Sequence, residues 1–186
     1  PDSEWVNWGM YRLMIHDERS MGSVLVPSQH IGKMYYEKHE PRNKPMEFAV
    51  AIGSDPVIPI VGCAMMPAYV NEVDIAGALR KEPVELVKCE TVNLYVPASS
   101  EIVIEGEILP YERKEEGPFG EYVGYRASEK SPKPVYRVKA ITHRNDPILT
   151  VSNMGVPIDD SHAVMPLTMA AEVLDELRTK GLPVKM

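Results

Sequence analysis

Short apolar runs, bounded by glycine, proline or charged residues, recur along most of the chain. Runs of this length are typical of strands rather than helices. Within residues 101–109 isoleucine partly alternates with glutamate, which is the pattern of a half-buried strand. We expect the last two runs to pair as a hairpin across the Asn-Asp-Pro segment between them. The pattern predicts about nine short strands, at residues 5–15, 24–26, 47–52, 57–64, 85–89, 94–96, 101–109, 135–144 and 148–152.

Helical signals are confined to residues 31–39, 71–80 and 163–180. Asn71 suits the N-cap of the second helix, and Asp160 or Ser161 that of the third. Many short strands with few helices indicate an α+β fold that is mainly β. The expected architecture is a closed or split antiparallel β-barrel with flanking helices, not a doubly wound parallel sheet.

The domain organisation follows from the last helix, which has no obvious partner layer. We expect a barrel domain over residues 1–160 and a helix over residues 161–186 that leads to a missing C-terminal domain. The chain begins Pro-Asp-Ser without a methionine. We therefore expect it to be a processed or excised piece of a longer protein.

Composition narrows the choice of partners. The 186 residues carry a net charge of −7 and no run rich in lysine or arginine. This argues against nucleic acid or an anionic membrane as the main partner. No apolar stretch is long enough to span a membrane and no signal peptide is recognisable, so a cytoplasmic protein is expected. Cys63 and Cys89 form no metal motif and are predicted to be free, buried thiols.

The segment Glu116-Gly-Pro-Phe-Gly-Glu121 holds two carboxylates close together in the sequence. Pro118 lacks a backbone donor and Gly120 is free to adopt a positive φ, so we predict a stiff turn that leads into a strand at residues 121–125. Such a turn can place two acids in different environments, so that one is protonated and the other ionised. The alternative is a surface turn with two solvated acids.

Arg12 lies inside the apolar run Met10-Tyr-Arg-Leu-Met-Ile15. It should therefore be partly buried and paired with an acid, although an ordinary surface charge is the alternative. A carboxylate of the turn would serve as the partner. Arg12, Glu116 and Glu121 would then form a unit that handles protons.

Asn7, His30 and Glu72 offer an amide, an imidazole and a carboxylate. Together these groups would suit Mn²⁺ or Mg²⁺ better than a soft metal. Separately, His30 reads as a structural histidine and Glu72 as an acid at a helix N-terminus. Spacing alone does not assemble the three residues into a site.

Several of these segments, taken in order, resemble motifs of the UbiD family of reversible decarboxylases, which use prenylated FMN. The resemblance covers nearly the whole chain. It is carried by Trp5-x-Asn7-x4-Arg12, Pro27-Ser-Gln-His30, Glu72-Val-Asp-Ile-Ala-Gly-Ala-Leu-Arg80, Glu85-Leu-Val-Lys-Cys-Glu-Thr91, Pro97-Ala, Glu105-Gly and Glu116-Gly-Pro-Phe-Gly-Glu121-x2-Gly-Tyr125.

The resemblance implies a role for each matching residue. The catalytic network would be Glu116, Arg12 and Glu121. The divalent metal, Mn²⁺ or Mg²⁺, would be held by Asn7, His30 and Glu72, which link the protein to the cofactor phosphate. A K⁺ ion would lie near Trp5, Ala64, Met66 and Glu72. The flavin would contact Gln29 and the backbone of Met10 and Tyr11.

The activity that the resemblance implies is non-oxidative, reversible decarboxylation of an aromatic or α,β-unsaturated carboxylic acid. The fold that it implies is a split barrel of the flavin-binding type, with flanking domains in family members. A flavin prenyltransferase would supply the cofactor, and the full-length protein would be a homo-oligomer. Tyr122 would face the substrate and hints at a phenolic acid. The alternatives are a flavin-phosphate and metal-binding module without activity, or a subunit of a multi-subunit aryl carboxylase.

Overall fold

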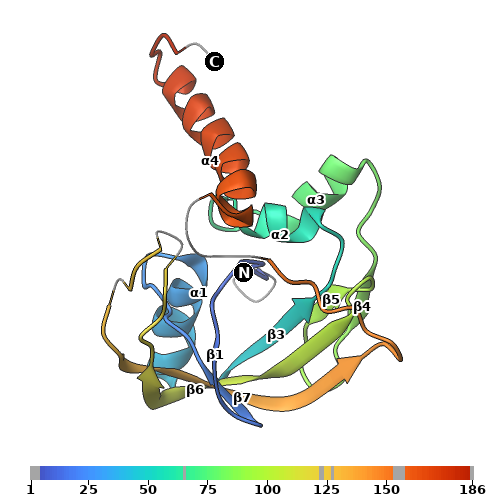
Figure 1. Cartoon of the computed structure of the whole chain (residues 1–186), viewed down its shortest axis with the longest axis vertical. Coiled ribbons are helices and arrows are strands. Elements are labelled where there is room, and N and C mark those ends of the chain that lie inside the picture. Colours follow the sequence, from blue (N-terminus) through green and yellow to red (C-terminus); the bar gives the residue numbers. More distant parts are fainter. Residues whose placement is uncertain (1–4, 65, 122–123, 127, 153–157, 185–186) are drawn as a thin grey trace.

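A computed structural model describes residues 5–64, 66–121, 124–126, 128–152 and 158–184. Its centre is an antiparallel five-stranded sheet in the order β1-β2-β7-β6-β3 (Figure 1). The strands are β1 (Met14–Asp17), β2 (Ser20–Gly22), β3 (Met46–Ile52), β6 (Ile102–Glu116) and β7 (Ser131–His143). β4 (Leu86–Lys88) and β5 (Tyr95–Pro97) pair as a separate two-stranded sheet.

The pairing of β6 with β7 is the longest in the sheet and is interrupted twice. At the first interruption, a Cβ added to Gly106 would lie 1.9 Å from the carbonyl oxygen of Arg137, so only glycine fits. At the second, Tyr111 has a φ of +58°. The strand then continues to Glu116, so the charged residues 111–115 belong to β6. This continuation places Glu116 at the end of a paired strand.

The prediction of a mainly β, α+β fold with antiparallel strands is confirmed. A closed barrel is not found, because among the described strands β1 and β3 are the two edges of the larger sheet.

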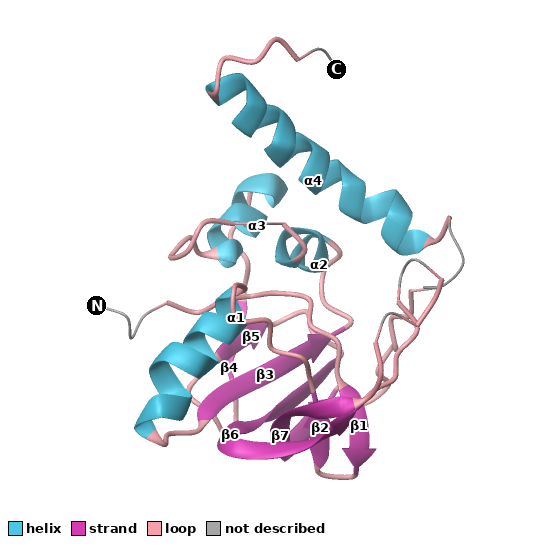
Figure 2. Cartoon of the chain, turned by 90° about the vertical axis from the view of Figure 1, so that its left-hand side faces the viewer, coloured by secondary structure: helices cyan, strands magenta, loops and turns pink. Residues whose placement is uncertain are grey.

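The helices lie outside the sheets (Figure 2). Residues 30–42 form one helical segment, in which α1 (His30–Lys33) is followed by a π-helix (Met34–His39) and a short 3₁₀ turn (Glu40–Arg42). α2 (Val57–Gly62) and α3 (Glu72–Arg80) pack against each other, and α4 (Asp160–Thr179) contacts α2 and extends away from the sheets. None of the helices in the described part of the chain combines the length and apolar character needed to cross a membrane.

The three predicted helices are present, but their caps differ from the expectation. Asn71 occupies the N-cap of α3 without a side-chain hydrogen bond. The N-cap of α4 is Asp159, whose carboxylate accepts from the backbone N–H of His162, and not Asp160 or Ser161.

Four predicted strands are wrong in part or in full. Within residues 57–64, Val57–Gly62 form α2, because Pro56 and Pro59 suit the first turn of a helix and the Asp55 carboxylate accepts from the N–H of Val57. Residues 5–13 are irregular, and β1 begins only at Met14. Residues 24–26, which follow β2, and residues 148–152, which follow β7, are also irregular. β7 pairs with β6, so the hairpin expected between residues 135–144 and 148–152 is not found.

The main core packs the helical segment 30–42 against the sheet. Its buried residues are Met21, Leu25, Tyr35, Met46, Phe48, Ile108 and Tyr136. A second cluster lies under β5 and contains Cys89, Val92, Val96 and Val103. Both cysteines are free, as predicted; Cys89 is buried while Cys63 is only half-buried. Burial and nearby glutamates raise the pKa of the Cys89 thiol to about 11.

Candidate functional site

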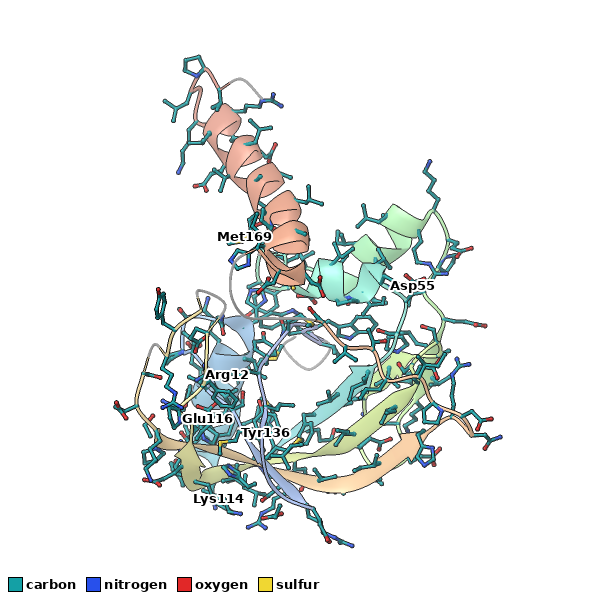
Figure 3. All side chains as sticks on the ribbon, viewed as in Figure 1. Arg12, Asp55, Lys114, Glu116, Tyr136 and Met169 are labelled. Carbon is teal, nitrogen blue, oxygen red and sulfur yellow. The ribbon has the colours of Figure 1, made fainter. Side chains whose placement is uncertain are left out.

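Arg12 pairs with both acids of the Glu116–Glu121 turn, and Figure 3 shows it beside Glu116. The Arg12 Nε donates to Glu116 Oε1 at 3.0 Å and its Nη2 to Glu116 Oε2 at 3.1 Å, which makes a bidentate pair. The Arg12 Nη1 donates to Glu121 Oε1. The fold thus brings Arg12 to two acids that lie 104 and 109 positions further along the chain. Their catalytic role remains a prediction.

Hydrogen bonds to neighbouring segments fix the position of this cluster. The Arg12 carbonyl oxygen accepts from the Ser23 hydroxyl at 2.7 Å, which holds the irregular N-terminal segment beside β2. On the other side, the Gly117 N–H donates to the Met14 sulfur at 3.2 Å. Gly117, not Gly120, has the positive φ, at +93°, and a cis peptide joins it to Pro118. The Glu121 N–H donates to the Tyr125 carbonyl, and Glu121, Gly124 and Tyr125 lie in no strand. The rest of the strand expected at residues 121–125 lies outside the described residues.

The two acids have different environments. The Glu116 side chain is 2% exposed, whereas that of Glu121 is 28% exposed. The hydrogen bonds from Arg12 to Glu116, only partly offset by burial, raise the pKa of the guanidinium. The ring of Phe119 covers one face of that guanidinium, with 4.6 Å from the Arg12 Cζ to the ring centroid. One acid is therefore a buried charge partner, and the other can exchange with solvent.

Asn7, His30 and Glu72 form a second cluster. Asn7 Oδ1 lies 3.0 Å from His30 Nδ1, a hydrogen bond when that nitrogen carries a proton. His30 Nδ1 lies 4.0 Å from Glu72 Oε1. His30 is the first residue of α1 and Glu72 the first of α3, so two helix starts supply two of the three groups. Glu72 is buried and also accepts from the N–H of Trp8 at 3.1 Å.

The donor set of this second cluster fits a hard divalent cation. It combines an amide oxygen, an imidazole nitrogen and a carboxylate. Neighbouring ligands of an octahedral Mg²⁺ lie about 3 Å apart, which matches the Asn7–His30 separation of 3.0 Å. In the described part of the chain, no three side chains of histidine, cysteine or acidic residues lie together as a metal site. The amide of Asn7 is what completes the set.

Of the other residues predicted to bind a cofactor or K⁺, Trp5 and Gln29 lie next to this cluster. The Trp5 ring packs edge-on against His30, with 5.0 Å between centroids. The Met10 N–H donates to the Gly62 carbonyl at 3.3 Å, next to the turn that carries Ala64 and Met66. Gln29 is the N-cap residue of α1. The K⁺ site and the flavin contacts remain predictions, and Tyr122, expected to face the substrate, lies outside the described residues.

Tyr11 plays a part that the sequence did not reveal. Its hydroxyl accepts from Asn7 Nδ2 at 2.9 Å and also hydrogen-bonds the backbone of Ile31, the residue after His30. Burial raises the pKa of this hydroxyl, and the hydrogen bonds only partly offset the effect. Since the amide nitrogen of Asn7 is engaged, its oxygen faces His30. The i, i+4 spacing of Asn7 and Tyr11 was the available signal, and it is weak in an irregular segment.

The site as a whole combines an arginine paired with two acids and a donor set that fits a divalent cation. Side chains of these types occur in general acid–base sites and in sites that hold a phosphate through a cation. The chain belongs to the UbiD family: the model of the 3-octaprenyl-4-hydroxybenzoate carboxy-lyase Rift-related domain matches residues 1–157.

Several curated relatives of the chain are decarboxylases. The pyrrole-2-carboxylic acid decarboxylase of Pseudomonas aeruginosa is 38% identical over 100% of this chain and 37% of its own length. Ferulic acid decarboxylase 1 of Saccharomyces cerevisiae is 37% identical over 99% of this chain and 37% of its own length. The chain thus spans well under half the length of these relatives.

Two solved structures are similar to this chain over most of its length. An evolved dimeric form of the UbiD-class enzyme HmfF from Pelotomaculum thermopropionicum, in complex with prFMN, superposes with a TM-score of 0.86 at 38% identity, covering 96% of this chain and 41% of that one. The vanillic acid decarboxylase of Sedimentibacter hydroxybenzoicus in its open form gives a TM-score of 0.80 at 32% identity, covering 92% of this chain and 36% of that one.

Proposed function

We propose that this chain is the cofactor-binding part of a longer carboxy-lyase. The enzyme would remove CO₂ non-oxidatively and reversibly from an aromatic or α,β-unsaturated carboxylic acid. The bridge that Arg12 makes between Glu116 and Glu121, in a chain of the UbiD family, is the observation that carries the proposal.

Glu121 is the proton donor in this proposal. In its protonated form it does not repel the carboxylate of the incoming substrate. It gives its proton to the carbon that loses CO₂, and Arg12 then stabilises the carboxylate that is produced. Because the Glu121 side chain is 28% exposed, it can take up a new proton from solvent. In the carboxylation direction it removes the same proton.

Glu116 has a different role. It is buried and holds the Nε edge of Arg12 through two hydrogen bonds. A bidentate pair of this kind fixes the plane of a guanidinium as well as its position. Glu116 therefore keeps Arg12 aimed at Glu121 while Glu121 gains and loses its proton.

Prenylated FMN, when bound, supplies the electron sink for the decarboxylation. Asn7, His30 and Glu72 would hold Mn²⁺ or Mg²⁺ against its phosphate, and Gln29 with the backbone of Met10 and Tyr11 would contact the flavin. Trp5, Ala64, Met66 and Glu72 would lie around K⁺. The HmfF structures in complex with prFMN and FMN support the choice of cofactor.

The finer features of the longer protein belong to the same proposal. Residues 1–160 would complete a split barrel of the flavin-binding type, and residues 161–186 would lead to a C-terminal domain. The protein would be a cytoplasmic homo-oligomer, and a flavin prenyltransferase would supply its cofactor. The substrate would be a small aromatic or unsaturated acid, in line with the decarboxylase relatives.

A second candidate follows from the length of the chain, which covers only 37% of the curated relatives. By itself the chain would then be a flavin-phosphate and metal-binding module without activity. Flavin absorbance and a Mn²⁺ titration of the 186-residue chain, next to activity of the full-length protein, separate the two candidates. In a variant of the first candidate, the protein is one subunit of a multi-subunit aryl carboxylase. A pull-down that recovers only a homo-oligomer, with no other subunit, would count against this variant.

The deciding experiment uses the full-length protein co-expressed with a flavin prenyltransferase and assayed with a panel of aromatic and unsaturated acids. Glu121→Gln should abolish decarboxylation and leave the flavin bound. Glu115→Gln is the matched control, because Glu115 lies on the same strand end and pairs with Lys130 on the surface. Full activity of Glu121→Gln would reject the assigned proton donor.

A further inference from the structure

The Arg12 guanidinium has a third partner besides its two acids. Its edges are engaged by Glu116 and Glu121, which leaves its two flat faces. The Phe119 ring lies over one of these faces, 4.6 Å from the Arg12 Cζ to the ring centroid. The proposed proton transfer uses the acids and gives Phe119 no part.

The backbone fixes the place of this ring. Phe119 stands between the two acids, in a turn tied down on both sides. Before it, the Gly117 N–H donates to the Met14 sulfur at 3.2 Å. After it, the Glu121 N–H donates to the Tyr125 carbonyl at 2.9 Å. The ring thus has little freedom to leave the guanidinium, although its side chain is only half-buried.

The contact has a defined chemistry. The face of an aromatic ring carries partial negative charge and attracts a guanidinium that lies over it. The ring also keeps water from that face. A guanidinium donates hydrogen bonds only in its own plane, so a ring held over its face keeps the plane fixed.

We propose that Phe119 is a positioning residue, whose ring holds the Arg12 guanidinium flat so that it serves Glu116 and Glu121 at the same time. The effect matters most for Glu121, which has a single hydrogen bond to Arg12 where Glu116 has two. A tilt of the guanidinium would break the single bond first. This inference rests on the proposed function for its catalytic consequence, but not for the contact itself.

A simple packing role for Phe119 makes different predictions. An apolar filler can be replaced by leucine at little cost, because the volume is nearly kept. It would also tolerate pentafluorophenylalanine, which keeps the shape of the ring but reverses the sign of charge on its face. A cation–π contact would be lost in both variants and retained with tyrosine.

The first measurement does not depend on activity. The full-length protein carries ¹⁵N-labelled arginine, and the Nε–H signal of Arg12 is assigned from its absence in Arg12→Lys. Leucine or pentafluorophenylalanine at position 119 should speed hydrogen exchange of this group about tenfold, the size expected for loss of a partly desolvated cation–π contact. Phe119→Tyr should leave it within about twofold of the parent. Unchanged exchange in the pentafluoro variant would overturn the proposal.

Arg113 provides an internal control in the same spectra. Its Cζ lies 5.6 Å from the centroid of the Tyr35 ring, away from the turn. Its Nε–H exchange should not change in any Phe119 variant. Faster exchange of both arginines would indicate general loosening of the fold and would also overturn the proposal.

The second measurement is the turnover of the holoenzyme. Leucine and pentafluorophenylalanine should lower kcat about tenfold with KM within about twofold, and tyrosine should restore kcat, because the loss concerns the alignment of Arg12 and Glu121 during proton transfer. If the parent enzyme decarboxylates no acid, the proposed function fails, and the exchange experiment alone decides the role of Phe119. An active parent whose leucine and pentafluoro variants keep full kcat would refute the catalytic part.

Discussion

Two clusters of this molecule use the same residue types and differ in their balance of charge. In the first, Arg12 faces two acids, Glu116 and Glu121, under the ring of Phe119. In the second, Arg113 faces one acid, Glu40, beside the ring of Tyr35. We call them the turn cluster and the core cluster.

The core cluster is fully paired. One oxygen of Glu40 accepts from Arg113 at 2.5 Å, from the Tyr35 hydroxyl at 2.8 Å and from the Tyr111 N–H at 3.0 Å. Tyr35 is fully buried, and its single hydroxyl proton is shared between Glu40 and the Leu109 carbonyl oxygen, which lies 2.7 Å away. These bonds tie the helical segment 30–42 to β6 at its second interruption. The cluster has no spare acid, so its function is to hold the strand that ends at Glu116.

The turn cluster, in contrast, has one acid more than its single cation can neutralise. Because the surplus acid, Glu121, is also the more exposed one, it can take up and release a proton without breaking the pair that stays behind. An arginine–glutamate pair is therefore structural when its charges balance. A surplus acid at the solvent edge of such a pair makes the cluster suited to proton transfer.

The largest difference between the two clusters is expected when the arginine of each is replaced by lysine. Arg12→Lys should lower kcat/KM of the holoenzyme about 10³-fold, since one ammonium cannot serve two carboxylates in a fixed plane. Arg113→Lys should keep activity within about twofold, because that cluster touches no reacting group. Steady-state kinetics with any accepted acid checks both. Arg12→Lys with more than a tenth of the parent activity would contradict the role of the turn cluster.

Removal of the cation from the core cluster should have the next largest effect. Arg113→Met leaves the buried Glu40 without its charge partner and should lower the free energy of unfolding by about 3 kcal/mol. Urea denaturation followed by circular dichroism measures the change. Stability equal to that of the parent would show that the core cluster does not hold β6 in place.

Replacing Tyr11, beside the metal cluster, or Tyr35, in the core cluster, should give a smaller difference, which concerns Mn²⁺ affinity. Tyr11→Phe should weaken Mn²⁺ binding about tenfold, because the Asn7 amide loses the partner that turns its oxygen toward His30. Tyr35→Phe removes a hydroxyl of the core cluster and should leave Mn²⁺ affinity unchanged. Isothermal titration of the full-length protein with Mn²⁺ compares the two, and equal affinities would remove Tyr11 from the metal site.

The parts of the fold that the sequence predicts well are those with a local signal. The helix at residues 71–80 has its N-cap residue and periodicity within a single segment, and the strand at residues 47–52 is an apolar run bounded by Pro45 and Gly53. The apolar run at residues 57–64 was misassigned as a strand, because a short run cannot be told from a helix by periodicity. The prolines at its start and the capping Asp55 decide for a helix.

Only the two acids of the candidate site share a local signal, the segment Glu116-Gly-Pro-Phe-Gly-Glu121. Arg12 and Glu116 are 104 positions apart, so the residue patterns suggested a pairing but could not establish it. The grouping of Asn7, His30 and Glu72 came from the resemblance to a family, and distances of 3.0 and 4.0 Å now join them. The side-chain contacts of Phe119 and Tyr11 have no sequence signal, because only the folded chain shows which polar group each ring contacts.

The smallest expected effect concerns the pH dependence of stability in the core cluster. Burial alone would raise the pKa of the Glu40 carboxyl, but hydrogen bonds from Arg113, Tyr111 and Tyr35 outweigh it and lower the pKa below the usual value. A carboxyl whose pKa is lowered by folding stabilises the protein above its unfolded pKa, about 4.3, and loses this contribution as the pH falls through the folded value.

Glu40→Gln removes this dependence. The parent's advantage over Glu40→Gln in free energy of unfolding should therefore shrink by about 1 kcal/mol between pH 7 and pH 3, measured by urea titration at each pH. A constant difference across that range would mean that Glu40 is not held as a carboxylate by its three donors, and the contrast between the two clusters would lose its electrostatic basis.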